Sequence, residues 1–249
     1  MARSIEEADA PSEAETPPPA ARRRTRRRRI LGRIALVMAA IVALPLLLVP
    51  VHALVRPVST LMLYDLVTLS GYTRTWAPLD SISPHLVRSV VMSEDGRFCT
   101  HGGVDWDALG AVLEAASEDG PARGASTVTM QTVKNLYLWN SRSYVRKGLE
   151  LPLALYADLV WSKRRTMEIY LNIAEWGPNL YGAEAAAQAY FGKSAKALSR
   201  REAALMTAAL PNPIARNPAK PTQRQSRIAR LVERRATQAG AYTDCLFDR

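Results

Sequence analysis

An uninterrupted apolar segment constrains this chain more than any other feature. Ile34–Val51 holds 18 residues without a charge and follows a run of arginines within residues 22–29. As a helix, a stretch of that length just spans a hydrocarbon core of about 30 Å. The sequence therefore predicts one transmembrane helix over residues 30–54, with Pro45 and Pro50 in its outer half.

The arginines before the apolar segment predict its orientation. The positive-inside rule places residues 1–29, a basic tail that we expect to be disordered, in the cytoplasm and the rest of the chain outside. A cleaved signal peptide is the alternative, but the segment is long for one, begins late and precedes no convincing small-residue cleavage site. Attraction to anionic lipid explains the arginines without nucleic acid. We expect an uncleaved anchor, a juxtamembrane segment at 55–80 and an outer domain at 81–249.

The charge of the outer domain is a moderate positive excess. The chain carries a formal net charge of +10, and residues 1–33 contribute +4 of it through nine arginines and five acids. The remaining +6 is compatible with nucleic acid, anionic lipid or a phosphate-bearing substrate, and the outward orientation argues against nucleic acid. Cys99 and Cys245 lack zinc-like spacing; they are either two unrelated thiols or, in an oxidising compartment, a disulfide.

The outer domain reads as a series of helices from about residue 80 onward. Apolar residues recur at helical spacing, and Gly and Pro residues separate alanine-rich runs at 183–189 and 203–209. No sustained alternation predicts a sheet. We therefore expect a mostly α domain. The clearest periodic sets are Val87, Val90 and Val91, and Met167, Tyr170, Leu171 and Ala174.

Glu94 is the first candidate catalytic residue, within SEDGRFCTHGGVDW at residues 93–106. It continues the apolar helical face of Val87, Val90 and Val91. Partial burial there raises the pKa of a carboxyl group and suits it to accept a proton near neutrality. Taken by itself, the segment favours the ordinary alternative, an acidic residue at a helix end beside a turn.

A second candidate is a polar helix face in GASTVTMQTVKNLYL at residues 124–138. Ser126 or Thr127 can cap this helix. Hydrogen-bond donors on a stripe that begins at a helix N-terminus suit a phosphate or sugar ligand. A solvated face would be similar, with more Glu and Lys and fewer amides. The polar positions are Thr127, Gln131, Lys134 and Asn135.

A third candidate is Glu150, which follows Arg146 and Lys147 at helical spacing. A surface ion pair worth about 0.2–0.5 kcal/mol accounts for that spacing. In the functional alternative, cations hold the carboxylate ionised and also receive an anionic leaving group, and both descriptions can hold together. If Glu94 and Glu150 share a cleft, one rests on an apolar face and the other among cations, which gives two carboxylates different roles.

Together these segments resemble, in order, the motifs of the peptidoglycan glycosyltransferases (glycosyltransferase family 51). SEDGRFCTHGGVD resembles ED-x-x-F-x-x-H-x-G-x-D, GASTVTMQTVKNLYL resembles G-x-S-T-x-T-x-Q-x-x-K-N-L, and RKGLE resembles R-K-x-x-E. Two more motifs match at Thr166–Lys193 and Arg201–Pro213, so the resemblance covers about residues 80–215. The chain is most similar to the monofunctional biosynthetic transglycosylases, because it lacks the S-x-x-K and K-T-G of a transpeptidase and residues 214–249 are too few for that domain.

The resemblance implies a lysozyme-like fold and a lipid-linked disaccharide-pentapeptide substrate, lipid II. It makes Glu94 the general base on the acceptor sugar 4-hydroxyl, and it makes Glu150 the carboxylate that assists at the donor pyrophosphate. It also implies a set of cations for that pyrophosphate and a set of polar substrate contacts. The cations are Lys134, Arg142 and Arg146, and the polar contacts are Ser126, Gln131 and Asn135.

Two departures from the family pattern bear on the site. Met130 stands where many members carry Gln, and its spacing predicts a buried side chain. Glu175 stands where others carry Tyr, either as a third cleft carboxylate or in a structural role. No dedicated metal-ligand set is evident in the sequence, so the ligands of any metal are unknown. We expect no permanently bound cofactor, and any Mg²⁺ or Mn²⁺ would be shared with the substrate pyrophosphate.

The leading hypothesis is a glycan polymerase in the bacterial inner membrane, with its catalytic domain in the periplasm. It would join lipid II into β-1,4-linked strands and release undecaprenyl pyrophosphate, and cell-wall synthesis or division proteins are candidate partners. A lytic glycosidase on the same fold is a second hypothesis, although it would need neither the anchor nor the cations. A non-catalytic wall-binding scaffold is a third, and the presence of both glutamates argues against it.

Overall fold

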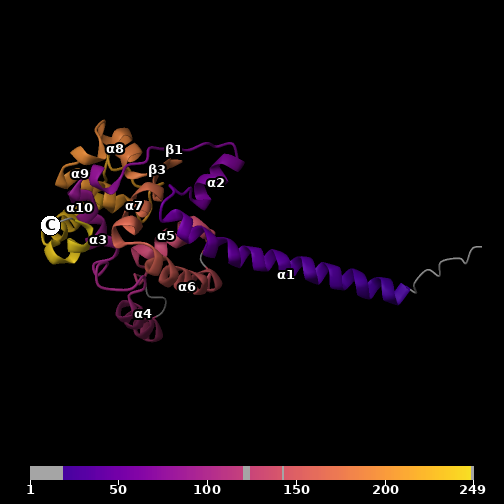
Figure 1. Cartoon of the computed structure of the whole chain (residues 1–249). Helices are drawn as coiled ribbons and strands as arrows, with labels where there is room; N and C mark the ends of the chain where they lie inside the picture. Colours follow the sequence, from indigo (N-terminus) through magenta and orange to yellow (C-terminus); the bar gives the residue numbers. More distant parts are fainter. Residues whose placement is uncertain (1–18, 120–123, 142, 248–249) are drawn as a thin grey trace, which may run out of the picture. The chain divides into compact units, whose positions relative to one another are not determined.

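The structure divides the chain into two units (Figure 1). The computed structural model describes residues 19–119, 124–141 and 143–247. The first unit ends at Leu44 and the second begins at Pro45. The second unit contains each described residue to which the sequence assigns a role in the site.

Helix α1 (Pro19–His52) contains the predicted membrane span. Within the described residues, Ile30–His52 is the one helical stretch long and apolar enough to cross a membrane. The expectation of disorder up to residue 29 is wrong for residues 19–29, which are helical. Arginine favours helix, so the helix extends back over the basic run. Residues 1–18 lie outside the described residues.

The second unit is mainly helical, which confirms the predicted fold class. A small sheet in the order β1-β3-β2 was not predicted, because strands of two or three residues are too short for alternation to appear. The strands are β1 (Thr73–Arg74), β2 (Glu175–Gly177) and β3 (Leu180–Tyr181), and β3 pairs parallel to β1 and antiparallel to β2. The α-helices after α1 are α2 (Thr60–Val67), α3 (Pro84–Glu94), α4 (Trp106–Asp119), α5 (Val128–Tyr137), α6 (Tyr144–Val160), α7 (Lys163–Ile173), α8 (Ala183–Phe191), α9 (Arg200–Ala209) and α10 (Gln223–Thr237). Short 3₁₀ helices are η1 (Leu79–Ser81), η2 (Ala195–Ala197) and η3 (Gly240–Leu246).

Hydroxyl side chains fix where most of these helices begin. Each capping oxygen accepts a hydrogen bond from a backbone N–H of the first helical turn, which would otherwise have no partner. Ser199 and Glu202 form a reciprocal capping box at the start of α9. The capping residues are Ser59, Ser83, Thr127, Ser143, Ser162, Ser199 and Thr222.

Residues 55–80, predicted as a separate juxtamembrane segment, belong to the second unit. Helix α2 packs against α5, and the Thr60 hydroxyl donates to the backbone carbonyl oxygens of Asn135 and Leu138. Met62 is buried on the inner face of α2. Its outer face leaves Leu63, Tyr64 and Leu66 exposed.

Helix α7 is the central helix of the second unit. Its side chains from Ile169 to Ile173 are all buried, and five successive residues cover more than one full turn, so this part of the helix is enclosed on every side. Met167, Tyr170 and Leu171 pack with α3 and α8 in one cluster. Ile169 and Ile173 pack with α5 and α6 in another. Helix α7 therefore fixes α3 and α5, the two helices that carry Glu94 and Gln131, relative to each other.

A disulfide joins Cys99 to Cys245, so the alternative of two unrelated thiols is wrong. The bond links the loop after α3 to the C-terminal 3₁₀ helix η3 across a sequence separation of 146 residues. Closing so long a loop restricts the unfolded chain, a contribution of about 2–4 kcal/mol to stability. It also anchors η3 beside the loop that follows Glu94.

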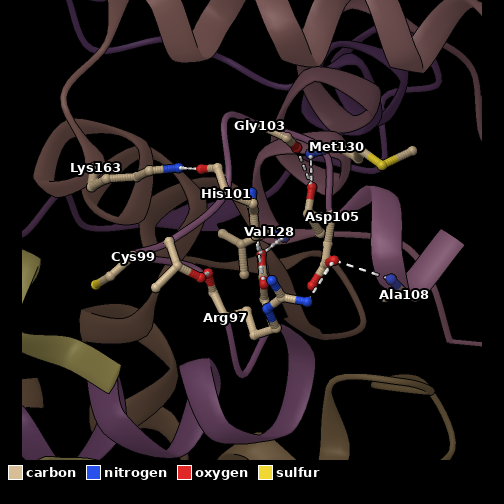
Figure 2. A network of polar contacts seen from close by, with 12 residues as sticks. Arg97, Cys99, His101, Gly103, Asp105, Ala108, Val128, Met130 and Lys163 are labelled. Carbon is tan, nitrogen blue, oxygen red and sulfur yellow. Dashed lines mark hydrogen bonds and ion pairs between the residues drawn. The ribbon is translucent and has the colours of Figure 1, made fainter. Parts of the chain in front are cut away.

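The loop between α3 and α4 is held by polar contacts from two other helices (Figure 2). The Thr127 hydroxyl donates to the Gly103 carbonyl oxygen at 2.6 Å and caps α5. The Lys163 ammonium group donates to the His101 carbonyl oxygen at 2.6 Å. The loop is therefore fixed on α5 and α7 at the same time.

Gly103 allows this loop to pack against α6. Its φ of +81° lies in the left-handed region, and a Cβ atom there would lie 2.5 Å from the Ala154 carbonyl oxygen. Only glycine satisfies both conditions without strain.

We therefore predict that Gly103→Ala lowers the free energy of unfolding by about 2–5 kcal/mol. This combines about 1–2 kcal/mol for the left-handed conformation with about 1–3 kcal/mol for overpacking. Urea unfolding of the purified protein measures the change. Gly102→Ala is the matched control, because its Cβ would lie 3.8 Å from the nearest atom, an Asp158 carboxylate oxygen. Equal stability of the two variants would contradict the packing argument.

Candidate active site

A groove of about 280 Å³ lies at the end of α3 that carries Glu94. The loop after α3, the start of α4 and the segment before α5 form its walls. It brings the first two sequence motifs together, because Glu94 and Ser126 line the same groove. The sequence alone gave no distance between them.

Glu94 lies where its helical spacing predicts. Val87, Val90 and Val91 are fully buried, and Glu94 is the last residue of the same α3 face. Its carboxylate accepts hydrogen bonds from the Gln131 amide at 3.3 Å and the Ser93 hydroxyl at 3.2 Å. Burial raises the pKa of Glu94, and these hydrogen bonds offset part of the rise. A carboxyl with a raised pKa is well suited to take a proton near neutral pH.

Tyr170 fixes the orientation of the Gln131 side chain. Its hydroxyl donates to the Gln131 amide oxygen at 3.2 Å, which leaves the amide nitrogen to face Glu94. Burial raises the pKa of Tyr170 well above its usual value, so it remains a protonated donor. Helical spacing predicts that Tyr170 lies in the core, but it does not predict this hydrogen bond. The available signal was chemical, because a buried tyrosine hydroxyl needs a partner.

Glu150 lies among the cations that its spacing predicts. It is buried on α6, forms an ion pair with the Arg146 guanidinium, and accepts from the Lys147 ammonium group at 3.0 Å. The Lys147 ammonium group also donates to the Ser126 hydroxyl at 2.6 Å. Because Ser126 lines the groove of Glu94, this contact connects the two carboxylate sites.

Two lysines beside the groove have lowered pKa values. Burial lowers the pKa of Lys147 to about 8, with further contributions from the positive charges of Arg146 and Lys134. Burial and Arg146 also lower the pKa of Lys134, and the negative charge of Glu94 opposes that shift. Lys134 therefore lies in the electrostatic field of both halves of the site. The side chains near Glu150 form a positively charged region, and a bound anionic group would neutralise that charge.

Asp95 holds the motif loop to α5. Its buried carboxylate accepts from the His101 Nε2 at 2.9 Å and from the backbone N–H of Val128 at 2.9 Å. Val128 is the first residue of α5, where the helix dipole also favours a negative charge. We gave neither Asp95 nor His101 a role from the sequence.

The remaining residues predicted to belong to the site have different surroundings, and one of them is not described. The Asn135 side chain has no hydrogen-bond partner among the described residues, while its backbone oxygen accepts from Thr60. Arg142 lies outside the described residues. Met130 is fully buried, as its spacing predicts. Glu175 does not line the groove; burial and the nearby Asp65 raise its pKa at the small sheet.

The described residues do not form a metal site by themselves. No three His, Cys, Asp or Glu side chains in that part of the chain gather as ligands. The Glu150 carboxylate is already engaged by two cations. A divalent ion shared with substrate phosphates stays a prediction, and no step below depends on it.

Comparison with known proteins identifies the family. The sequence model of the family described as Transglycosylase matches residues 63–237. A biosynthetic peptidoglycan transglycosylase of Agrobacterium fabrum is 59% identical over 218 residues, which cover 87% of this chain and 96% of that protein. Proteins of the same name are 60% identical over 211 residues in Brucella suis, covering 85% of this chain and 94% of the relative, and 55% identical over 218 residues in Rhizobium meliloti, covering 87% and 92%. The chain belongs to the transglycosylase family.

Proposed function

We propose that this chain is a peptidoglycan glycosyltransferase that polymerises lipid II into β-1,4-linked glycan strands and releases undecaprenyl pyrophosphate. One observation carries the proposal: a half-buried carboxylate of raised pKa lies in a groove whose wall residue Ser126 is hydrogen-bonded to Lys147, one of the cations around a second carboxylate. Membership of the transglycosylase family and the names of the relatives support the same reaction.

Glu94 acts as the general base of this reaction. It takes the proton of the acceptor sugar 4-hydroxyl as that oxygen attacks the anomeric carbon of the growing chain. The bond from that carbon to the lipid pyrophosphate breaks, so one displacement inverts the anomeric configuration. The hydrogen bond from Gln131 holds the carboxylate in place, and Tyr170 holds Gln131.

The cations around Glu150 stabilise the leaving pyrophosphate. Lys134, Arg146 and Lys147 together carry more positive charge than Glu150 neutralises. Fixed cations cost no reorganisation as negative charge develops on the leaving group. Glu150 orients Arg146 and Lys147, while Ser126, Gln131 and Asn135 contact the substrate. The assignment of Arg142 to the pyrophosphate rests on the resemblance alone.

The same cations argue against the lytic alternative. A glycosidase also uses a carboxyl of raised pKa, so Glu94 by itself does not distinguish the two reactions. A glycosidase has no phosphate to bind, however, and Glu150 cannot by itself balance the charges of Arg146, Lys147 and the half-buried Lys134. A phosphate donor explains why these cations lie beside the groove.

The apolar part of α1 anchors the protein in the inner membrane, with the N-terminus in the cytoplasm and the catalytic domain in the periplasm. The arginines before Ile30–His52 support this orientation. The disulfide between Cys99 and Cys245 also supports it, because such bonds persist in oxidising compartments. An anchor in the same chain keeps the domain at the membrane, where a lipid-linked substrate arrives.

For the topology, we predict that protease added outside spheroplasts degrades the catalytic domain while the N-terminal tail remains protected. Antibodies to tags at each end of the chain detect the two fragments on a blot. A cytoplasmic protein of the same cells controls for lysis. Degradation of the N-terminal tag with survival of the C-terminal tag would reverse the proposed orientation.

For the base, we predict that Glu94→Gln lowers the rate of lipid II polymerisation by a factor of about 10²–10⁴, because the amide accepts no proton. Gel analysis of glycan made from labelled lipid II measures the rate, and thermal unfolding checks the fold. Glu175→Gln is the matched control, a half-buried glutamate of raised pKa outside the groove. A normal rate for Glu94→Gln would refute the assignment. Release of sugars from mature wall without use of lipid II would favour the lytic alternative.

For the cations, we predict an alkaline limb in the pH profile of kcat/KM near the Lys147 pKa of about 8. Above that pH the amine loses its proton and no longer balances Glu150, so activity falls. Lys147→Arg should move the limb to higher pH, because a guanidinium stays charged. Lys193→Arg is the control, since Lys193 forms a comparable ion pair with Glu202 outside the groove. An unchanged alkaline limb in Lys147→Arg would exclude Lys147 as its source.

A further inference from the structure

A second hollow, of about 370 Å³, lies between α3, α9 and α10. It shares no lining residue with the groove of Glu94. Arg88 lies on α3 like Glu94, but six residues earlier, and the 3.6-residue repeat turns the two side chains about 120° apart. The principal polar lining residues are His85, Arg88, Ser89, Arg200, Glu233 and Thr237.

This hollow is positively charged, and its own lining residues do not neutralise Arg88 and Arg200. Arg88 and Arg200 form no ion pair with any described carboxylate, and the Arg88 guanidinium stacks over the Phe247 ring at 4.9 Å. Glu233 is already paired with Arg201 at 3.7 Å. Burial lowers the pKa of His85, and the positive charges of Arg200 and Arg88 lower it further.

The exposed face of α10 continues this positive region. Four of its arginines, at positions 224, 227, 230 and 234, are spaced three or four residues apart, and like charges at that spacing destabilise a helix by about 0.2–0.5 kcal/mol per pair. The helix dipole favours the arginines of the last turn but not those of the first half. Another hollow on this face, of about 380 Å³, shares Glu233 with the first. The exposed arginines are Arg224, Arg227, Arg230, Arg234 and Arg235.

We infer that the α3/α9/α10 face docks an acidic peptide segment of a partner protein. Its carboxylates would lie along the α10 arginines, with one inserted between Arg88 and Arg200. Arginine suits this role because its planar fork of donors matches a carboxylate. No relative's name and no part of the proposed reaction requires such a surface, so the inference stands apart from the proposed function.

Two other anionic ligands fit this face less well. A bilayer that meets the exposed apolar residues of α2 would not reach α10, because α2 packs on α5 whereas α10 packs on α9 and α3 at the far side of the second unit (Figure 1). The peptide of the substrate would start in the groove of Glu94, and that groove shares no lining residue with this hollow.

The test is a binding measurement on the full chain in detergent. A fluorescein-labelled peptide of alternating Glu and Gly is titrated at about 0.15 M salt and followed by fluorescence anisotropy. A peptide of alternating Gln and Gly is the uncharged control. We expect saturable binding of the acidic peptide, weakened about tenfold or more by the double change Arg88→Gln with Arg200→Gln, and no binding of the Gln peptide.

A second variant keeps the test decisive if that double change disturbs packing. Arg227→Gln with Arg230→Gln alters exposed residues of α10 and should weaken binding similarly. Arg56→Gln is the matched control, an exposed arginine that also stacks on an aromatic ring, that of Trp76, and it should bind as the parent does. Polymerisation of lipid II should be normal in all of these variants. Unchanged peptide affinity in both double variants overturns the inference, as does stronger binding to phosphatidylglycerol vesicles that the same arginines control.

Discussion

The buried carboxylate of Asp95 is the contact on which the arrangement of the site depends. It directly follows Glu94, and it accepts hydrogen bonds from the backbone of Val128 and from His101. One end of α3 is thereby fixed to the first residue of α5. Gln131, one turn into α5, then comes within hydrogen-bonding distance of Glu94. Removing this contact would leave a buried helix N-terminus without its acceptor, so its geometric role and its energetic role are inseparable.

Surroundings, and not residue type, give the two glutamates different properties. Glu94 ends an apolar helix face, where burial favours its neutral form and raises its pKa. Glu150 is equally a carboxylate, but Arg146 and Lys147 hold it from the same helix. Glu94 can therefore accept a proton, whereas Glu150 holds the cations of Arg146 and Lys147 in position. Ser126 connects these two environments, because it lines the groove of Glu94 and accepts a hydrogen bond from Lys147.

The sequence predicted those features that local spacing determines. Helical periodicity placed Glu94 on a buried face, and the i−4 and i−3 positions placed Arg146 and Lys147 on Glu150. Contacts between distant segments were not predictable in this way. Tyr170 meets Gln131, and His101 meets Asp95, only after α7 and the motif loop have packed. Periodicity marks such residues as buried and says nothing about which polar group they meet.

The net charge of this chain is equally uninformative about contacts, because a single number sums cations in three different surroundings. Arginines precede the apolar segment of α1, Lys134 and Lys147 are half-buried beside a groove, and the arginines of α10 are exposed. Composition gives these groups equal weight. Burial separates them, because a buried cation needs an anion nearby while an exposed one is solvated by water. The half-buried lysines therefore say more about the substrate than the larger number of arginines at the surface.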